Sequence, residues 1–495
     1  MELGAGPECG LLRTTAPGLV ASGELVALVH PPIIHRALDL APERLAPIIG
    51  SWPEPALLES GPGSGQAGRW SLLAARPRMV FEATGTAWTL RTDAGAQESG
   101  EGDILGRLAA WLDQFGLADP SEMPDPDRPP FQGGAIGYFG YDLAPRLERV
   151  PRKAPRDSRL PDIRLALYDT AVTIDHASGA VELWAHDLLG EGATAAERRC
   201  RDWRRALAEA GPAAGRGSQL GPLESNFSRE GYRAAVGRVL EYIAAGDLFQ
   251  ANLSQRFAAR GRPAPLDLYL RLKRQSPAPF AAFLRWDDLA VVGASPEWFY
   301  RTRGDRLVTR PIKGTRPRGR DRAEDERLAD ELRRSRKDRA ELTMIVDLER
   351  NDLGRVCRFG SVRVIDPVTV ESFAQVHHLV ATVAGDIRPG LGPIDILRAV
   401  FPGGSITGAP KVRAMEIIDE LEPTRRSLYT GAIGYFSRGG ASGFNIAIRT
   451  MLVEGDRVSF QVGGGIVADS DPEAEYLETL HKGRGLRAVI EGVDR

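Results

Sequence analysis

The hydrophobic positions in the second half of the chain recur with two periods, one typical of helices and one of strands. Helical periodicity predicts five helices, at residues 229–245, 321–335, 338–351, 410–422 and 472–491. In the fourth of these, an apolar residue recurs every three positions, which predicts one buried face made of Val412, Met415, Ile418 and Leu421. Short apolar and β-branched runs predict strands at residues 289–293, 361–365, 431–436 and 458–462.

The first half of the chain contains short runs of strand type, such as residues 172–175 and 181–184, separated by turn residues. Two stretches rich in proline and glycine interrupt the pattern. Residues 119–130 predict a surface loop, and residues 211–222 predict a linker. The linker divides the chain into parts 1–222 and 223–495, which we expect to be interwoven in one fold. Because the helices and strands do not alternate as βαβ units, the expected fold class is α+β, a mixed α/β sandwich.

Composition excludes several classes of protein. The 495 residues include 64 basic and 66 acidic side chains with mixed signs throughout, which disfavours a nucleic-acid partner. Three cysteines spaced far apart disfavour a disulfide framework and favour a reducing compartment. No apolar stretch is long enough for a membrane helix, and the first residues lack the pattern of a signal peptide. The expectation is a soluble, cytoplasmic protein.

Two pairs of acidic residues are the first candidates for a binding site. Asp338 and Glu341 are three residues apart on one predicted helix, and Glu475 and Glu478 are three apart on another. This spacing places both carboxylates of a pair on one helical face. If the two helices faced each other, the four carboxylates would form an oxygen-rich site suited to Mg²⁺. Taken alone, such pairs are more often solvated helix faces.

Several segments have the composition of an anion-binding site. Residues 401–411 place glycines and hydroxyl groups, including Ser405, ahead of a predicted helix, where free N–H groups attract anions. Gly463, Gly464 and Gly465 follow a predicted strand and could seat a carboxylate or form a bulge. Arg449 ends an apolar run and either points from a strand into a cleft or lies at the surface.

Three further residues have both a catalytic and an ordinary interpretation. Glu297 follows a predicted buried strand and either acts as a general acid or only shapes the chain there. His378 has no third ligand at a useful spacing, so a hydrogen-bonding histidine is favoured over a zinc ligand. Lys313 lies in a loop between Arg310 and Arg316, whose charges are compatible with a lowered pKa and a nucleophilic amine. An arbitrary lysine is more often solvated.

Taken in order, these segments resemble the chorismate-utilising enzymes. The resemblance covers more than 200 residues through ten ordered motifs, at residues 246–254, 295–297, 311–319, 338–352, 378–380, 404–411, 434–436, 448–450, 463–467 and 475–479. The first half matches more loosely, at residues 57–60 and 133–138. The family fold is a sandwich of two large antiparallel sheets with helices outside, so the resemblance implies this fold and a chorismate site with Mg²⁺ between the layers.

The resemblance also implies a role for each candidate residue. Glu341 and Glu478 would contact the metal, and Asp338 and Glu475 would assist through water. Substrate contacts would come from Gln250, Thr315, Ser405, Tyr435, Arg449, Gly463, Gly464, Gly465 and Lys482. His378 would lie near the oxygen substituents of the ring.

Two positions separate the members of this family. Gln250 stands where the water-adding enzymes have a lysine base, and a neutral amide cannot deprotonate water. Lys313 stands where anthranilate synthases usually carry alanine and aminodeoxychorismate synthases carry lysine. The resemblance therefore implies that Lys313 attacks ring carbon 2 while protonated Glu297 assists loss of the carbon 4 hydroxyl. Ammonia would then add at carbon 4 and give 4-amino-4-deoxychorismate, for 4-aminobenzoate and folate synthesis.

Two alternatives remain open at this point: an anthranilate synthase component I, and a catalytically silent subunit that keeps the fold. The three cysteines lack the glycine-rich setting of a glutaminase nucleophile, so the resemblance implies a separate glutamine amidotransferase partner that supplies ammonia. It also implies a tryptophan pocket at Glu59, Ser60, Pro279 and Phe280. A regulatory and a structural role for that pocket are both compatible with the sequence.

Overall fold

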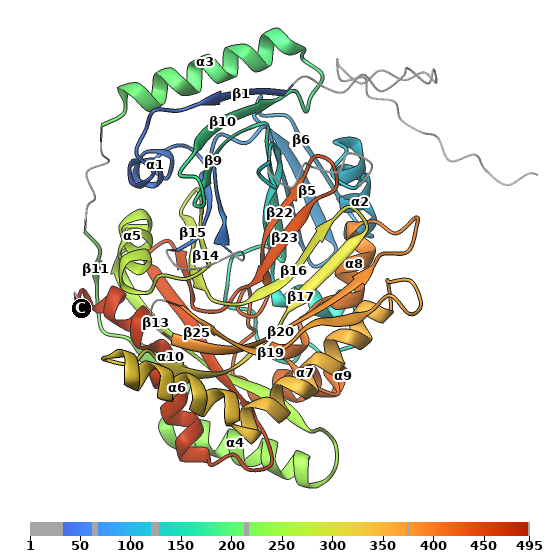
Figure 1. Cartoon of the computed structure of the whole chain (residues 1–495), viewed down its shortest axis with the longest axis vertical. Coiled ribbons are helices and arrows are strands. Elements are labelled where there is room, and N and C mark those ends of the chain that lie inside the picture. Colours follow the sequence, from blue (N-terminus) through green and yellow to red (C-terminus); the bar gives the residue numbers. More distant parts are fainter. Residues whose placement is uncertain (1–32, 62–67, 120–127, 212–216, 374–375, 494–495) are drawn as a thin grey trace, which may run out of the picture.

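The computed structural model describes residues 33–61, 68–119, 128–211, 217–373 and 376–493. Most of the predicted loop at 119–130, the middle of the predicted linker at 211–222, and Cys9 lie outside these residues. Within the described residues the strands form two antiparallel sheets of 13 and 12 strands, with helices on their outer faces (Figure 1). The expected sandwich of two large antiparallel sheets is confirmed.

The first sheet runs from the N-terminal strands to the strands around the predicted site. Its order is β1 (Ile33–Ala37), β10 (Val181–His186), β9 (Thr170–Asp175), β3 (Trp70–Ala74), β2 (Ala56–Glu59), β14 (Phe280–Trp286), β15 (Leu289–Ser295), β24 (Thr450–Glu454), β25 (Arg457–Ile466), β13 (Gln250–Arg262) and β11 (Gln219–Leu220). Two short strands, β12 (Glu224–Ser225) and β21 (Gly408–Ala409), also pair with β13.

The second sheet begins with the strand that carries Lys313. Its order is β18 (Ile312–Pro317), β20 (Val376–Asp386), β17 (Arg306–Arg310), β16 (Trp298–Arg303), β23 (Ser442–Ile446), β22 (Ala432–Ser437), β7 (Gly134–Phe139), β8 (Ile163–Tyr168), β4 (Met79–Thr84), β5 (Ala87–Thr92) and β6 (Gln97–Glu101), with β19 (Arg363–Ser372) also on β20. Strands from both sides of residue 222 are neighbours in each sheet, as β2 beside β14 and β7 beside β22.

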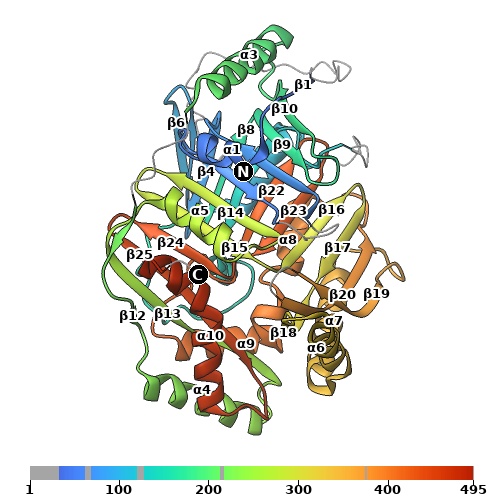
Figure 2. The same ribbon diagram turned by 60° about the vertical axis from the view of Figure 1, so that its left-hand side comes forward.

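The helices and two short 3₁₀ turns complete the chain. They are α1 (Pro42–Ile49), α2 (Ile104–Gln114), η2 (Tyr141–Arg146), α3 (Ala193–Glu209), α4 (Arg229–Ala244), α5 (Pro265–Gln275), α6 (Arg322–Arg334), α7 (Arg336–Gly354), α8 (Pro393–Val400), η3 (Gly404–Ile406), α9 (Lys411–Leu421) and α10 (Pro472–Glu491). Figure 2 shows α4, α9 and α10 together at one end of the molecule. No described helix is both long and apolar enough to cross a membrane.

The core has three layers, which explains why the strands are hydrophobic on both faces. Side chains from both sheets meet in an inner cluster that includes Tyr138, Trp286 and Ile433. Outer clusters pack helices such as α2 and α8 on the second sheet, α1, α3 and α5 on the first sheet, and α4 and α9 on β13 of the first sheet. Burying both faces of a sheet removes the polar alternation of a solvated sheet.

The predicted elements are confirmed with small shifts. The helices at 229–245, 321–335 and 472–491 match α4, α6 and α10 within a residue, whereas the helix at 338–351 is longer as α7. The strand at 361–365 begins later, at Arg363, and runs to Ser372. The predicted buried face of α9 is partly wrong. Val412 is 37% exposed, and the buried residues are Ala414, Met415, Ile417 and Ile418, because the face that packs on β13 follows the 3.6-residue period.

Candidate functional site

The second sheet places Lys313 where two sheets and a helix converge. Lys313 lies on β18, with Nζ 3.0 Å from Oε1 of Glu341 on α7 and donating to the Ser405 carbonyl at 3.3 Å. Gln250, the first residue of β13, donates from Nε2 to the same Glu341 oxygen at 3.1 Å. Four predicted residues, far apart in the sequence, are therefore in contact.

Gly314 explains how the chain turns beside Lys313. Its φ is +71°, a conformation that favours glycine. A Cβ atom there would lie 2.8 Å from Leu332 Cδ1 and 2.9 Å from Asp338 Cβ. Any side chain at position 314 would therefore clash with α6 and α7, and only glycine lets β18 approach them this closely. The next residue, Thr315, lies with its Oγ1 3.0 Å from Nδ1 of His378.

The second acidic pair lies on α10, against the three glycines of β25. A Cβ atom on Gly464 would lie 3.0 Å from Oε2 of Glu475 and 3.6 Å from Oε1 of Glu478. Lys482 pairs with Glu478 at 2.7 Å and donates to the Gly463 carbonyl at 3.0 Å. Gly465 lies beside the Gln250 amide, which contacts Glu341. The glycines therefore form the surface that separates the α10 acids from the Lys313 cluster.

Charges from both clusters act on the acidic residues. The pKa of Glu475 is raised, first by burial and then by the neighbouring Glu478, while Ser470 donates to it at 2.6 Å. Burial would also raise the pKa of Glu478, but Lys482, Lys337 and Lys313 outweigh it and hold that pKa low. The Gln250 amide, which lies beside Gly465 and donates to Glu341, links the two clusters.

The four carboxylates suit a hard cation, although they do not form a closed cage. Across the described ranges no three acidic, histidine or cysteine side chains converge tightly enough to hold a metal ion. Mg²⁺ does not need such a cage, because it binds through one or two carboxylates and keeps several waters. Glu478 is half exposed and Glu341 partly so, which leaves each with a face open to solvent. The chemistry of these donors therefore suits Mg²⁺, although the carboxylates do not converge on one point.

A substitution at Gly463 tests this surface. A Cβ atom there would lie 2.5 Å from the Leu253 carbonyl oxygen on β13, a backbone atom that cannot move aside. We expect Gly463→Ala to destabilise the protein by about 1–3 kcal/mol, as overpacking typically does, measured by urea unfolding. Gly237→Ala, in helix α4 with no atom within 4 Å of the added Cβ, is the matched control and should be neutral or stabilising. Equal stability of both variants would contradict this packing.

Glu297 lies next to this cluster, directly before β16. It is 6% exposed, and burial raises its pKa, opposed by Ser405, Lys313 and Lys482. Its Oε1 has no hydrogen-bond partner among the described residues. A buried carboxyl group with a raised pKa and an unpaired oxygen can carry a proton to a bound molecule.

His378, on β20, is neutral at neutral pH. Burial and the charge of Arg449 lower its pKa to about 4. Its Nδ1 contacts Thr315, whereas its Nε2 has no hydrogen-bond partner in the described part of the chain. A neutral imidazole with a free nitrogen can exchange a hydrogen bond with a ligand.

Arg449 does not end a strand, which corrects the prediction. β23 ends at Ile446 and β24 begins at Thr450, and Arg449 lies in the connection with φ +50°. Burial lowers the pKa of its guanidinium, and no described carboxylate lies within ion-pair distance of it. A mostly desolvated guanidinium without a carboxylate, held in a left-handed backbone conformation, is prepared for an anionic ligand.

A cavity of about 150 Å³ lies between the two sheets, and the residues predicted for tryptophan line it. These are Glu59, Ser60, Pro279 and Phe280. The Glu59 carboxylate is already bonded, however, to Tyr269 at 2.6 Å and Lys273 at 2.5 Å. It is therefore not a free partner for a ligand.

Tyr435 also lines this cavity between the sheets. Its ring stacks edge-on against Phe131 at 5.7 Å, within the inner core. The predicted role of Tyr435, holding a substrate carboxylate beside Lys313, is not supported by this position. Strand alternation explains the difference, because Tyr435 shares the face of β22 with Ile433, which points into the core between the sheets.

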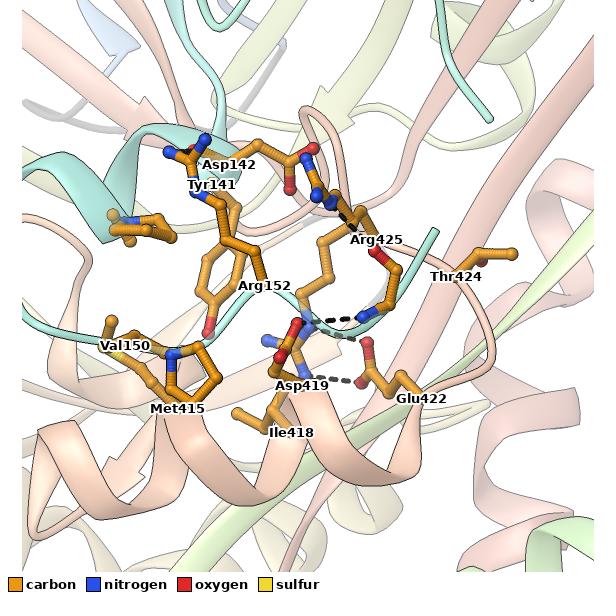
Figure 3. A pocket seen from close by; sticks show the side chains of 15 residues that line it. Tyr141, Asp142, Val150, Arg152, Met415, Ile418, Asp419, Glu422, Thr424 and Arg425 are labelled. Atoms are coloured by element: carbon orange, nitrogen blue, oxygen red, sulfur yellow. Dashed lines mark hydrogen bonds and ion pairs between the residues drawn. The ribbon is translucent and has the colours of Figure 1, made fainter. Parts of the chain in front are cut away.

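Another cavity, of about 40 Å³, was not predicted and lies between η2 and α9 (Figure 3). Its wall includes Glu422 and Arg426, an ion pair 2.6 Å apart that is almost completely buried. Arg426 donates to the carbonyls of Ile406 and Asn252. The pair therefore supports the segment that carries Ser405. An acid and a base four residues apart predict a solvated pair, so the sequence gives no local signal for this role.

Comparison with known proteins agrees with this geometry. Residues 56–488 match the model of the chorismate binding enzyme family. The chain is 40% identical to anthranilate synthase component 1 of Cereibacter sphaeroides over 448 residues, 88% of this chain and 89% of that one. It is 42% identical to aminodeoxychorismate synthase component 1 of Klebsiella aerogenes over 439 residues, 88% of this chain and 93% of that one.

The solved structure of anthranilate synthase component I from Streptococcus pneumoniae superposes with a TM-score of 0.74 at 31% identity, covering 84% of this chain and 91% of that chain. Relatives at about 40% identity thus divide between two activities, and overall identity does not choose between them. The family itself follows from the match over most of the chain. The protein belongs to the chorismate binding enzyme family.

Proposed function

We propose that this protein aminates chorismate at ring carbon 4, giving 4-amino-4-deoxychorismate. The observation that supports this product is the position of Lys313, whose amine contacts Glu341 and Ser405 and acts electrostatically on the buried Glu297. A nucleophile beside a protonated carboxyl group is the arrangement that substitution of a ring hydroxyl needs. An anthranilate synthase, in which alanine usually replaces this lysine, would lack that nucleophile.

Chorismate has two carboxylates, and the site offers two regions for them. Arg449, without an acidic partner in the described residues, binds one carboxylate in a bidentate manner. The second lies near Lys482 and the Gly463–Gly465 backbone, on the side of the α10 acids. His378, with its free Nε2, hydrogen-bonds an oxygen substituent of the ring.

The reaction proceeds in two displacements. The amine of Lys313, as the free base, forms a bond to carbon 2 while the ring double bonds shift and the bond from carbon 4 to its hydroxyl breaks. Glu297 gives its proton to the departing hydroxyl, which leaves as water. Ammonia then bonds to carbon 4, the double bonds shift back, and the bond from carbon 2 to Nζ breaks. The ionised Glu297 takes one proton from the new ammonium group and is ready for another turnover.

Mg²⁺ would be held by Glu341 and Glu478, with Asp338 and Glu475 assisting through water. When bound, it would supply positive charge for the ring carboxylate. Gln250 donates to Glu341 at 3.1 Å and, as an amide, cannot remove a proton from water. This supports amination over hydration at the same site.

A separate glutamine amidotransferase would supply the ammonia, which agrees with the name component 1 borne by the relatives. Tryptophan would occupy the cavity of about 150 Å³ between the sheets. There the Ser60 hydroxyl donates to the Pro279 carbonyl at 3.1 Å and so joins the two predicted segments of the pocket.

The direct experiment is incubation of the purified protein with chorismate, Mg²⁺ and an ammonium salt. We expect an aminated chorismate of unchanged carbon skeleton by mass spectrometry, with no release of pyruvate. Fluorescent anthranilate together with pyruvate would instead establish the rival activity. If no chorismate is consumed even with a glutaminase partner present, the protein is a silent subunit.

The raised pKa of Glu297 predicts the alkaline limb of the pH profile. Because burial raises this pKa above its usual value of 4.5, the acid form persists at higher pH than in an exposed glutamate. We expect turnover to fall as pH rises through the raised pKa, since only the protonated group can assist loss of the hydroxyl. The measurement is kcat against pH for wild type and Glu297→Gln. If the alkaline limb of the kcat profile is unchanged in Glu297→Gln, a group other than Glu297 causes it.

A further inference from the structure

A buried carboxyl group that the proposed reaction does not use lies behind the site. Glu349, on α7, and Thr309, on β17, are 4% and 3% exposed. Thr309 Oγ1 is 2.8 Å from the Phe299 carbonyl oxygen and 3.0 Å from Glu349 Oε2. The Phe299 carbonyl lies where the pairing of β16 with β17 is irregular, and there it accepts from the Thr309 hydroxyl.

The two contacts of the Thr309 hydroxyl, with Phe299 and with Glu349, cannot both use its single proton. A threonine hydroxyl has one proton, and a carbonyl oxygen can only accept. If that proton is donated to Phe299, the contact with Glu349 is a hydrogen bond only when Glu349 donates. Glu349 must then be a neutral carboxylic acid.

The charges around Glu349 favour the neutral form. Burial raises its pKa, and the carboxylate of Asp352 on the same helix raises it further. Lys411 of α9 opposes this, but its amine is committed to Asp352 at 2.6 Å, and a hydrogen bond donated by Thr309 to Glu349 would also lower this pKa. Glu297, before β16, acts in the same direction as Asp352 when it is ionised. No other ionisable group of the described residues is a leading contributor.

This contact joins the parts of the proposed site. Helix α7 carries Asp338 and Glu341, whereas β17 leads directly into β18 and Lys313. The ion pair of Asp352 with Lys411 holds the same helix to the start of α9, just after the segment that carries Ser405. A shift of α7 on β17 would therefore separate Glu341 from Lys313.

We propose that Glu349 is a positioning residue that works as a neutral acid, donating its proton to Thr309 and so fixing α7 against β17. The role in turnover rests on the proposed function, whereas the protonation state does not. Both parts can be tested separately.

The protonation state is tested by stability against pH. The unfolded chain loses this proton near the usual value of 4.5, whereas the folded chain keeps it to higher pH. Between these values the unfolded state binds fewer protons, so wild-type stability falls as pH rises. Glutamine cannot ionise. We therefore expect the Tm of Glu349→Gln minus that of wild type to increase by several degrees from about pH 5 to about pH 8 and then to stay constant.

Asp347→Asn is the matched control, because Asp347 lies on the same helix with a 66% exposed side chain. Its Tm difference from wild type should not vary over this range. If Glu349→Gln lowers the Tm at every pH above 5, Glu349 is an ionised partner of Lys411 and the proposal is wrong.

The positioning role is tested by turnover at neutral pH. Glu349→Gln keeps a donor for Thr309 and should stay within about twofold of wild type, whereas Glu349→Leu and Thr309→Val should lose about tenfold or more. Folded Glu349→Leu with wild-type turnover would overturn the role. If the wild-type protein makes a different product from chorismate, the proposed function is wrong. The relative turnover of the variants and the pH dependence of the Tm difference still test the role of Glu349.

Discussion

Lys313→Ala is expected to lower ammonia-dependent turnover by on the order of 10³-fold, the scale typical of losing a catalytic nucleophile. The amine of Lys313 contacts Glu341 at 3.0 Å. Alanine removes the nucleophile while leaving Arg449 and Lys482 to bind substrate. We therefore expect the loss in kcat, with KM changed much less, measured with saturating ammonium salt.

Two controls separate nucleophilic attack from a simple effect of charge. Lys313→Arg keeps a positive charge that can pair with Glu341, but a guanidinium does not lose its proton and cannot attack. It should be as inactive as the alanine variant. Lys337→Ala removes another lysine whose charge acts on Glu475 and Glu478, and it should retain most of the activity. Recovery of turnover in Lys313→Arg would show that only the charge matters.

Glu422→Ala is expected to destabilise the protein by about 3–5 kcal/mol, because it leaves a buried guanidinium without its counter-ion. The side chains of Glu422 and Arg426 are 3% and 1% exposed. Glu422 also accepts from the backbone N–H and the hydroxyl of Ser254, at 2.9 and 2.8 Å. Its removal takes the acceptor from four donors at once, two on Ser254 and two on Arg426, and unfolding in guanidinium chloride should report the loss.

Glu420→Ala is the matched control for this measurement. Glu420 lies on the same helix but is exposed, and it accepts one surface hydrogen bond from Tyr242 at 2.7 Å. It should change stability by less than about 1 kcal/mol. Similar values for the two variants would mean that the buried pair contributes no more than a surface contact.

Local patterns predicted the helices well because their boundaries depend on nearby residues. The helix at 472–491 was predicted from its helical periodicity, and α10 has these bounds, with Asp471 accepting from the first-turn N–H groups. The antiparallel sandwich was predicted from the absence of βαβ units together with the family motifs, and the pairing of all strands agrees.

Contacts between distant segments could not be predicted in this way. The resemblance placed Tyr435 beside the substrate, and the preceding apolar run placed Arg449 at a strand end. Both differ in the structure, since Tyr435 faces the inner core and Arg449 lies in a left-handed connection. The Glu349–Thr309 contact joins residues 40 positions apart and has no periodic signal. Sequence patterns report which face is apolar, but not which polar groups meet once the sheets are packed.

Mass spectrometry of the protein during turnover tests the central claim most directly. With chorismate and Mg²⁺ but without ammonia, we expect the peptide containing Lys313 to gain the mass of chorismate less one water. The added mass should disappear when ammonium salt is supplied and should be absent from Lys313→Arg. Turnover at the wild-type rate by Lys313→Ala, with no adduct on the wild-type peptide, would contradict covalent catalysis by Lys313.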